Sequence, residues 1–404
     1  MKHRYARVLQ ASPGNSFASA CYHRPVENRS KPSFRAEHIG SLLRPAKLKE
    51  ARDRLEGDHH ARVRGSRRFR ELEGLENECI LAAIRMQEEV GLQVVTDGEF
   101  RRRSWWQDFA LELEGTFIDF GDHGLVFRDP QGHKLPVPVG FVDGKIRRVR
   151  GFNTHCFEFL SKNTRLTPKV TMPAPHALHF FGGRQCIDSG VYPDLQEFWR
   201  DLACAYREEI ADLARLGCRY VQLDDAMFAT MCDPAVQEQL RARGDDPKAL
   251  LADYVQAVNS AIAGRPADMT AAIHLCRGNN RGHWMASGGY DFVAAALFGE
   301  LQVDSYLLEY DTPRAGDFSP LARLPAGKTA VLGLISSKTP LLETREAIKR
   351  RIDEAARFAP LEQLGISPQC GFSSHFLGNP LSEDEQRRKL ELVVEVAREV
   401  WGQT

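Results

Sequence analysis

Short apolar runs recur along the chain, and most of them end in polar residues or glycine. Several are continuous rather than alternating, which is typical of parallel strands that are covered on both faces. Eight runs predict strands at residues 36–41, 92–97, 169–175, 220–225, 270–276, 305–310, 329–336 and 365–372.

Between these runs, apolar residues recur at spacings of three and four with charged residues between them, the pattern of helices with one buried face. It predicts helices over residues 69–90, 195–216, 235–263, 341–358 and 383–400. Asp194 is placed to cap the start of the second helix, and Gly217 closes it. Ser382 is the expected N-cap of the last helix.

Eight strands that alternate with helices, without an obvious linker, predict one α/β domain, a (β/α)8 TIM barrel over residues 35–404. A doubly wound open sheet is the competing architecture. Residues 108–150 and 176–192 exceed the minimum barrel and are expected to be inserted segments. In the first of them, Asp143-Gly144 lies between two strand-like runs, which predicts a β-hairpin.

The N-terminal thirty residues are basic, with no acidic residue before Glu27, and they lack the apolar core of a secretory signal. We expect residues 1–34 to be a disordered or processed tail. An Arg- and Ser-rich transit peptide is the alternative. The expected location is therefore the cytoplasm, or an organelle if this tail is a transit peptide.

The 404 residues include 54 Lys and Arg and 54 Asp and Glu, and this balance argues against a non-specific nucleic-acid binder. A hydrophobic content of 43% excludes global disorder. The nine cysteines are scattered and odd in number, which favours reduced thiols. The longest uncharged stretch, residues 363–382, is broken by prolines and glycines, so we expect no membrane span.

Candidate chemistry collects at the carboxyl ends of the predicted strands, where barrel enzymes build their active sites. These positions carry metal ligands and acids to an unusual degree. They are Ser41, Asp97, Glu99, Asp224, Asp225, His274, Cys276, Glu309, Lys338 and Cys370.

His274 and Cys276 are the central pair, because residues two apart on a strand point to the same side and can reach one ion. Alone, the pair also fits a buried cysteine beside a hydrogen-bonded histidine. Cys370 and Glu309 lie at the ends of two other strands that converge on the barrel opening. Two thiolates, an imidazole and a carboxylate form a tetrahedral set suited to Zn²⁺.

Such a set also describes a closed structural zinc site, but those usually hold small, loop-rich modules together. If Glu309 is labile, a substrate thiol can take its place and bind as a thiolate. The predicted chemistry is therefore alkyl transfer to sulfur.

Taken together, these motifs resemble the catalytic barrel of cobalamin-independent methionine synthase, and more closely the shorter single-barrel proteins of that superfamily. The resemblance spans about residues 35–404. It is carried by Ile39-Gly40-Ser41, Asp97-Gly98-Glu99, Gln222-Leu223-Asp224-Asp225, His274-Leu275-Cys276, Leu308-Glu309 and Gln369-Cys370-Gly371.

The resemblance implies a methyltransferase with two small-molecule partners, homocysteine and a methyl donor. The zinc ligands that it implies are His274, Cys276, Glu309 and Cys370. The homocysteine-binding residues that it implies are Ile39, Gly40, Ser41, Glu99 and Asp224, of which Asp224 would hold the ammonium group.

Two features depart from the family pattern. The full-length enzymes have a second, N-terminal barrel that helps to bind the folate polyglutamate tail, and this sequence shows none. The family's catalytic histidine aligns with Lys338, which would donate a proton to the leaving group or bind a differently charged substrate. Methyltetrahydrofolate is thus one candidate donor among others.

The leading prediction is a zinc-dependent S-methyltransferase that converts homocysteine to methionine. An epoxyalkane:coenzyme M transferase-type reaction is the first alternative. Coenzyme M carries a sulfonate, which needs cationic contacts that Lys338 and Arg277 would supply. Glu99 and Asp224 instead favour an amino-acid thiol. A catalytically silent zinc-binding barrel is the second. We expect no nucleic-acid or membrane partner, and the oligomeric state is left open.

Neighbouring side chains add three smaller expectations. Asp225 faces away from Asp224 on a strand and is expected to be structural. Trp105 or Trp106 would cover the pocket or pack against the inserted segment. The basic run at residues 101–103 would attract an anionic tail or form a solvated face.

Overall fold

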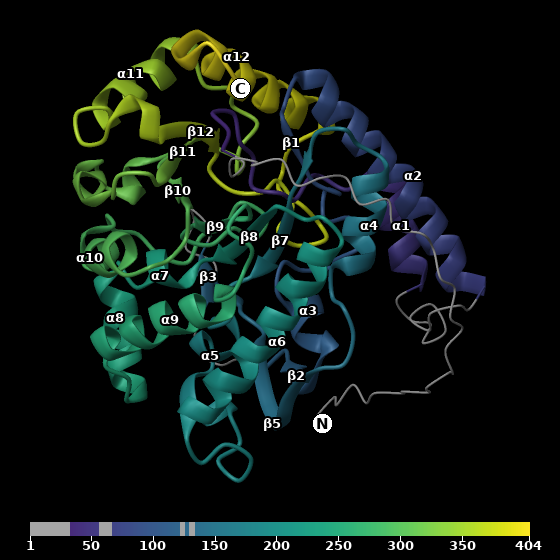
Figure 1. Ribbon diagram of the computed structural model, residues 1–404, viewed down its shortest axis with the longest axis vertical. Coiled ribbons are helices and arrows are strands. Elements are labelled where there is room, and N and C mark those ends of the chain that lie inside the picture. Colours follow the sequence, from purple (N-terminus) through teal and green to yellow (C-terminus); the bar gives the residue numbers. More distant parts are fainter. Residues whose placement is uncertain (1–32, 56–66, 122–125, 129–133) are drawn as a thin grey trace.

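The computed structural model describes residues 33–404 except 56–66, 122–125 and 129–133 (Figure 1). Residues 1–32 of the predicted tail lie outside this described part. Six parallel strands form the main sheet, in the order β12-β11-β10-β9-β8-β7. They are β7 (Val170–Pro173), β8 (Tyr220–Asp225), β9 (Thr270–Leu275), β10 (Ser305–Glu309), β11 (Thr329–Ile335) and β12 (Leu364–Pro368).

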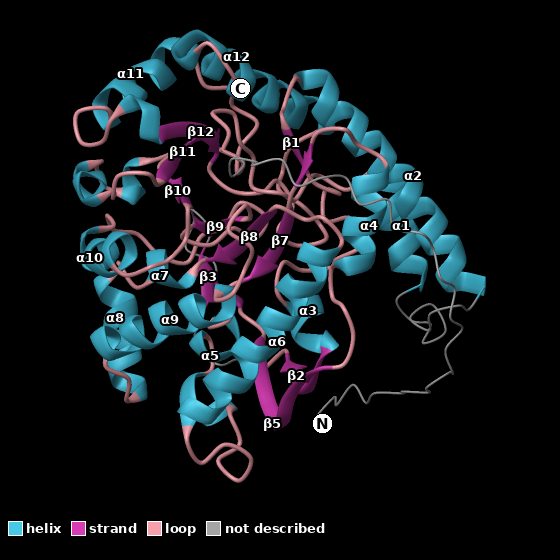
Figure 2. Ribbon diagram, in the orientation of Figure 1, coloured by secondary structure: helices cyan, strands magenta, loops and turns pink. Residues whose placement is uncertain are grey.

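Helices surround these strands on the outside (Figure 2). They are α1 (Ala46–Leu55), α2 (Arg67–Val90), α3 (Gln107–Glu112), α4 (Thr154–Lys162), α5 (Ala177–Phe180), α6 (Leu195–Arg215), α7 (Met227–Thr230), α8 (Pro234–Arg243), α9 (Pro247–Ile262), α10 (Asp291–Gly299), α11 (Arg345–Ala355) and α12 (Glu383–Trp401). Within the described ranges, none of them combines the length and the apolar character needed to cross a bilayer.

The first two predicted strands are much shorter than expected. Residues 36–41, predicted as a strand, make only a parallel bridge from Ala36 to Ile366 of β12. The second strand shrinks to β1 (Val94–Val95), which pairs with β6 (Thr167–Pro168) just before β7. Both segments still occupy the places of barrel strands, between β12 and β7.

Hydrogen bonds outside a regular ladder join these two segments to each other. The backbone N–H of Leu42 donates to Gly98 O over 3.1 Å. The Thr96 hydroxyl donates to Gly40 O over 2.7 Å. Sequential parallel strands whose last member meets the first are the topology of the (β/α)8 barrel, not of the open doubly wound sheet.

A buried ion pair fixes the first segment inside the barrel. Lys169 Nζ lies 3.0 Å from Glu37 Oε2, and the Tyr220 hydroxyl donates to Glu37 Oε1 over 2.5 Å. Each of the three residues is 1% exposed. A buried charge is tolerated only when it is paired and hydrogen-bonded, so these contacts hold residues 36–41 against β8 and the chain before β7.

The predicted helix at residues 235–263 is two helices, α8 and α9. Gly244 ends α8 in the left-handed conformation with φ +97°, and Pro247 opens α9. The Asp246 side chain accepts the backbone N–H of Lys248 and caps the second helix. Turn chemistry therefore interrupts an apolar pattern that continues across it. The N-caps predicted at Asp194 and Ser382 are confirmed.

The hairpin predicted at Asp143-Gly144 is wrong. Both residues lie inside β5 (Val139–Arg148), which pairs antiparallel with β2 (Leu113–Asp119). A shift in register opposite Gly115 absorbs them, and Gly115 has φ +80°. A Cβ on Gly115 would lie 2.5 Å from the Gly144 carbonyl oxygen, so the strands approach too closely there for a side chain. A second antiparallel pair joins β3 (Val126–Arg128) and β4 (Lys134–Pro136).

Removing the charge of Glu37 tests the buried ion pair. Glu37→Gln leaves the Lys169 ammonium without a counter-ion in the barrel interior, and we expect it to lower the free energy of unfolding by about 3–5 kcal/mol. Glu238→Gln, in the exposed pair with Arg241, is the matched control and should change it by less than about 1 kcal/mol. Equal effects of the two substitutions in urea denaturation would contradict this role for the ion pair.

Candidate active site

Predicted site residues converge on one pocket at the carboxyl ends of the strands. Its empty volume is about 490 Å³, open mouth included. The predicted residues that line it are Ile39, Ser41, Glu99, Asp224, Asp225, His274, Cys276 and Cys370. Gly40, Glu309 and Lys338 are not among the lining residues. Strands far apart in the sequence thus deliver their terminal side chains to one place.

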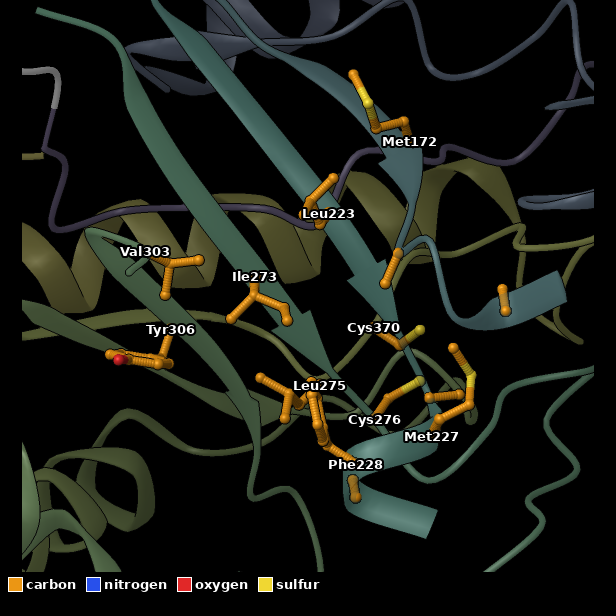
Figure 3. Packing of buried hydrophobic residues seen from close by; sticks show 14 of the residues in the cluster. Met172, Leu223, Met227, Phe228, Ile273, Leu275, Cys276, Val303, Tyr306 and Cys370 are labelled. Atoms are coloured by element: carbon orange, nitrogen blue, oxygen red, sulfur yellow. The ribbon is translucent and has the colours of Figure 1, made fainter. Parts of the chain in front are cut away.

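Three candidate metal ligands form a compact buried cluster. His274 lies on β9, Cys276 follows that strand, and Cys370 follows β12. One ligand atom from each lies within 4.8 Å of the others. Figure 3 shows the two cysteine side chains next to each other beyond the strand ends.

The orientation of the His274 ring suits metal binding. Its Nδ1–H donates to Leu307 O over 3.2 Å, and Nε2 is buried without a hydrogen-bond partner among the described residues. Contact with Cys276 favours the Cys370 thiolate and, helped by His274, holds the pKa of Cys370 well below its ordinary value despite burial. Two sulfurs and an imidazole nitrogen are a donor set that would suit Zn²⁺.

Glu309, the predicted fourth ligand, lies outside this cluster. Its fully buried carboxylate accepts the backbone N–H of Arg277 over 2.5 Å and a guanidinium N–H of Arg314 over 2.9 Å. Burial disfavours the charged form, but Lys338, Arg277 and Arg314 outweigh it and lower the pKa of Glu309 to about 2. Its role as a metal ligand stays a prediction.

Lys338 faces Glu309. Its Nζ lies 3.7 Å from Glu309 Oε1 and makes no hydrogen bond to any residue that the structure describes. The side chain is 7% exposed. The predicted function as a proton donor is untested, and the geometry makes the ammonium a counter-ion of Glu309.

Two carboxylates stand on the pocket wall. The Asp97 carboxylate accepts the backbone N–H of Glu99 over 2.9 Å and supports its left-handed conformation, φ 59°. Glu99 Oε1 accepts the Thr171 hydroxyl over 2.7 Å, and Asp224 Oδ1 accepts the Gln222 amide over 2.6 Å. Burial, together with the negative charge of Glu99, raises the pKa of Asp224 to about 7. Paired buried carboxylates of this kind can bind an ammonium group.

Gly40 makes room for this arrangement. It has φ +135°, and a Cβ there would lie 2.8 Å from Glu99 Oε1 and 2.7 Å from Thr171 Cγ2. The neighbouring Ser41 accepts through its carbonyl oxygen the N–H of Phe372 over 2.9 Å. The segment at residues 36–41 therefore reaches both the carboxylates and the loop that carries Cys370.

The Asp225 carboxylate contacts His176 Nε2 and accepts the N–H of Phe228, which is the predicted structural role. Trp105 lines the pocket, whereas Trp106 is buried behind it.

The basic run is tied into the fold rather than left as a solvated face. The Arg101 guanidinium pairs with Glu76 at 3.0 Å, and the Arg102 guanidinium donates to Asn153 over 3.1 Å.

Several lining residues were not assigned to the pocket from sequence: Phe181, Met285 and Ser374. They come from loops without periodicity. Thr171 and Gln222 orient the two carboxylates. Of these two, Gln222 could be found from the sequence, because it lies two residues before Asp224 on a strand and so faces the same side. Asn279, in the loop after Cys276, also lines the pocket, and its side-chain amide donates to Gly371 O over 2.9 Å.

Comparison with known proteins points to the same family that the sequence motifs resemble. The family model "Cobalamin-independent synthase, Catalytic domain" matches residues 175–399. The uncharacterized protein YxjH of Bacillus subtilis is 41% identical over 382 residues, 93% of this chain and 97% of that protein. Methionine synthase of Pyrococcus abyssi is 25% identical over 295 residues, 73% of this chain and 75% of that protein.

Two solved structures share the architecture. A structural genomics target from Listeria monocytogenes superposes with a TM-score of 0.69 and 33% identity, covering 93% of this chain and 100% of that one. A B12-independent methionine synthase from Shewanella sp. W3-18-1, in complex with selenomethionine, gives a TM-score of 0.67 at 20% identity, over 91% and 98%. The latter likeness concerns the fold alone.

Metal analysis tests the cluster. We expect the purified chain to hold about one Zn²⁺, and Cys276→Ser or Cys370→Ser to remove it, because each substitution deletes one of three donors. Loss of even an indirect contact typically costs 10- to 100-fold in metal affinity, so loss of a donor should cost more than about 100-fold.

The exposed Cys204 offers a matched control, and Cys204→Ser should keep the zinc. Zinc content and affinity would be read by atomic emission and chelator competition. Full zinc retention in both Cys276→Ser and Cys370→Ser would refute the cluster as the metal site.

Proposed function

The chain belongs to the family of the cobalamin-independent synthase catalytic domain, and from this premise we propose that it is a zinc-dependent methyltransferase that methylates homocysteine to methionine. One observation carries the proposal: the buried His274, Cys276 and Cys370 cluster opens onto a pocket whose wall presents Glu99 and Asp224. Zn²⁺ held by these three residues would lower the pKa of a substrate thiol and stabilise its thiolate.

The side chains of the pocket divide the remaining tasks. Glu99 and Asp224 bind the ammonium group of homocysteine, which directs its thiol toward the three donors. Thr171 and Gln222 hold those carboxylates in place through the hydrogen bonds described above. Apolar groups, including Trp105, line part of the pocket and limit water. With the thiol directed in this way, the sulfur attacks the methyl carbon in line with its leaving group.

The pocket favours an amino-acid thiol over coenzyme M. Among the described residues, its charged lining side chains are Glu99, Asp224 and Asp225, and no lysine or arginine belongs to the lining. A sulfonate would meet carboxylates there. Arg277, a cation invoked for the alternative, is fully buried and donates to Gly288 O over 2.9 and 2.6 Å.

Substituting the two carboxylates tests how the amino acid is bound. Glu99→Gln and Asp224→Asn should raise the KM for homocysteine about 10- to 100-fold, because each removes a charge-assisted hydrogen bond to the ammonium group. Zinc content should stay unchanged. With 4-mercaptobutyrate, which is homocysteine without its ammonium group, the same variants should lose little relative to wild type, and equal losses with both thiols would contradict the assignment.

Turnover separates the proposal from a silent zinc-binding barrel. Zinc-loaded protein supplied with homocysteine and a panel of methyl donors should form methionine, detected by mass spectrometry. Stoichiometric zinc without methylation of any thiol by any donor would contradict the enzyme proposal and support a catalytically silent zinc-binding barrel.

A further inference from the structure

The identity of the methyl donor depends on how its leaving group departs. When methyl leaves the tertiary amine of methyltetrahydrofolate, the amine would carry negative charge unless a general acid protonates it. When methyl leaves a sulfonium or quaternary ammonium centre, the leaving group departs as a neutral sulfide or amine. The first class of donor therefore needs an acid in the pocket, and the second class does not.

Among the described residues, no lysine or arginine lines the pocket beside the metal cluster, and the carboxyl groups of the lining have other partners. Lys338, the residue at the family's histidine position, keeps its Nζ 3.7 Å from Glu309 Oε1 and is not part of the pocket lining. Arg314 donates to the same oxygen atom of Glu309 and lies 3.8 Å from Asp311, so the two cations and the two carboxylates form one charge cluster. Of the acidic lining groups, Glu99 and Asp224 are committed to the ammonium of homocysteine and Asp225 to His176.

The pocket wall instead suits a positive methyl donor. Trp105, Phe181 and Met285 supply two aromatic rings and a thioether, and the described lining contains no lysine or arginine. Aromatic faces attract alkylated cations, and this is the usual means by which proteins recognise onium groups.

This wall is held in place by the fold. The backbone N–H of Trp105 donates to Ser374 O over 2.9 Å, and Ser374 Oγ lies 3.7 Å from Cys370 Sγ, so the backbone at Trp105 is joined to the loop of a metal-ligand candidate. Phe181 packs against Trp106 with ring centroids 5.8 Å apart. The two faces are thus positioned before a ligand arrives.

We propose that the methyl donor is a small onium compound, a methylsulfonium or a methylated quaternary ammonium, rather than a folate. The proposal rests on the proposed function. The homocysteine thiol releases its proton to water, and the sulfur lone pair forms the new bond to the methyl carbon. The bond from that carbon to the onium centre breaks, and its electron pair stays on the departing sulfur or nitrogen. The products are methionine and a neutral sulfide or amine, with no proton required from Lys338.

A donor panel tests the proposal. Zinc-loaded protein with homocysteine would be given S-methylmethionine, dimethylsulfoniopropionate, glycine betaine, or methyltetrahydrofolate with one and with three glutamates. With S-methylmethionine, isotopic labelling of the transferred methyl distinguishes product from spent donor. We expect kcat/KM for at least one onium donor to exceed that for either folate by 100-fold or more.

Each outcome of the donor experiment bears differently on the onium proposal and on the proposed function. Turnover with sulfonium donors and turnover with betaine identify the source of the onium methyl, and each supports the proposal. Methionine formed from folate alone overturns the onium donor and leaves the proposed function standing. No methionine from any donor, in protein that binds zinc and homocysteine, overturns both.

Trp105 gives a second, independent test. Trp105→Leu should raise the KM for the onium donor about 5- to 30-fold, the range expected for loss of a desolvated aromatic–cation contact. The KM for homocysteine and the zinc content should stay unchanged. Trp105→Phe keeps an aromatic face and should restore most of the affinity.

A direct binding measurement tests recognition of the onium group without relying on turnover. Calorimetric titration of the zinc-loaded wild type, Trp105→Leu and Trp105→Phe with tetramethylammonium, an inert onium probe, should show the same order of affinities. Equal onium affinity in all three proteins would overturn the proposed recognition, and matching circular dichroism spectra would show that the variants are folded.

Discussion

A single buried ion pair, between Lys169 and Glu37, allows an irregular segment to serve as the first strand of the barrel. Residues 36–41 have few ladder hydrogen bonds to keep them in the sheet, and the pair, with the Tyr220 hydroxyl, replaces that ladder with a contact across the barrel interior. Because an unpaired charge at this depth is costly, the segment is held in one position. That position brings Ile39 and Ser41 to the pocket.

Charges at the mouth of the barrel are sorted into two groups. Lys338 and Arg314 surround Glu309 on one side, where every charge has an opposite partner within the protein. Glu99 and Asp224 line the pocket, and the Arg102 guanidinium lies 3.6 Å from the Glu99 carboxylate. The lining of the pocket is therefore acidic, and Lys338, although it is not part of the lining, lies near enough to Cys276 and Cys370 for its charge to favour their thiolates.

Much of the fold follows from the sequence, because continuous apolar runs report strands that are buried on both faces. The exceptions are local. Residues 36–41 depend on contacts between side chains distant in sequence, and Asp143-Gly144 is absorbed by a bulge opposite Gly115 that no local pattern encodes. In the site, the two-residue period of β9 predicts His274 and Cys276 as neighbours. The position of Glu309 depends on Arg314 and Lys338, and the loop residue Phe181 carries no periodic signal.

The aromatic wall has a different origin from the metal cluster, and the difference bears on how the protein can diversify. His274, Cys276 and Cys370 stand at the ends of strands that the barrel needs for its stability. Phe181 belongs to residues 176–192, a segment in excess of the minimum barrel. Mutation can remodel that segment, and with it the range of molecules admitted, while the ligand-bearing strands stay constant. Under the proposed function, exchange of this one peripheral loop would change which methyl donors the pocket admits.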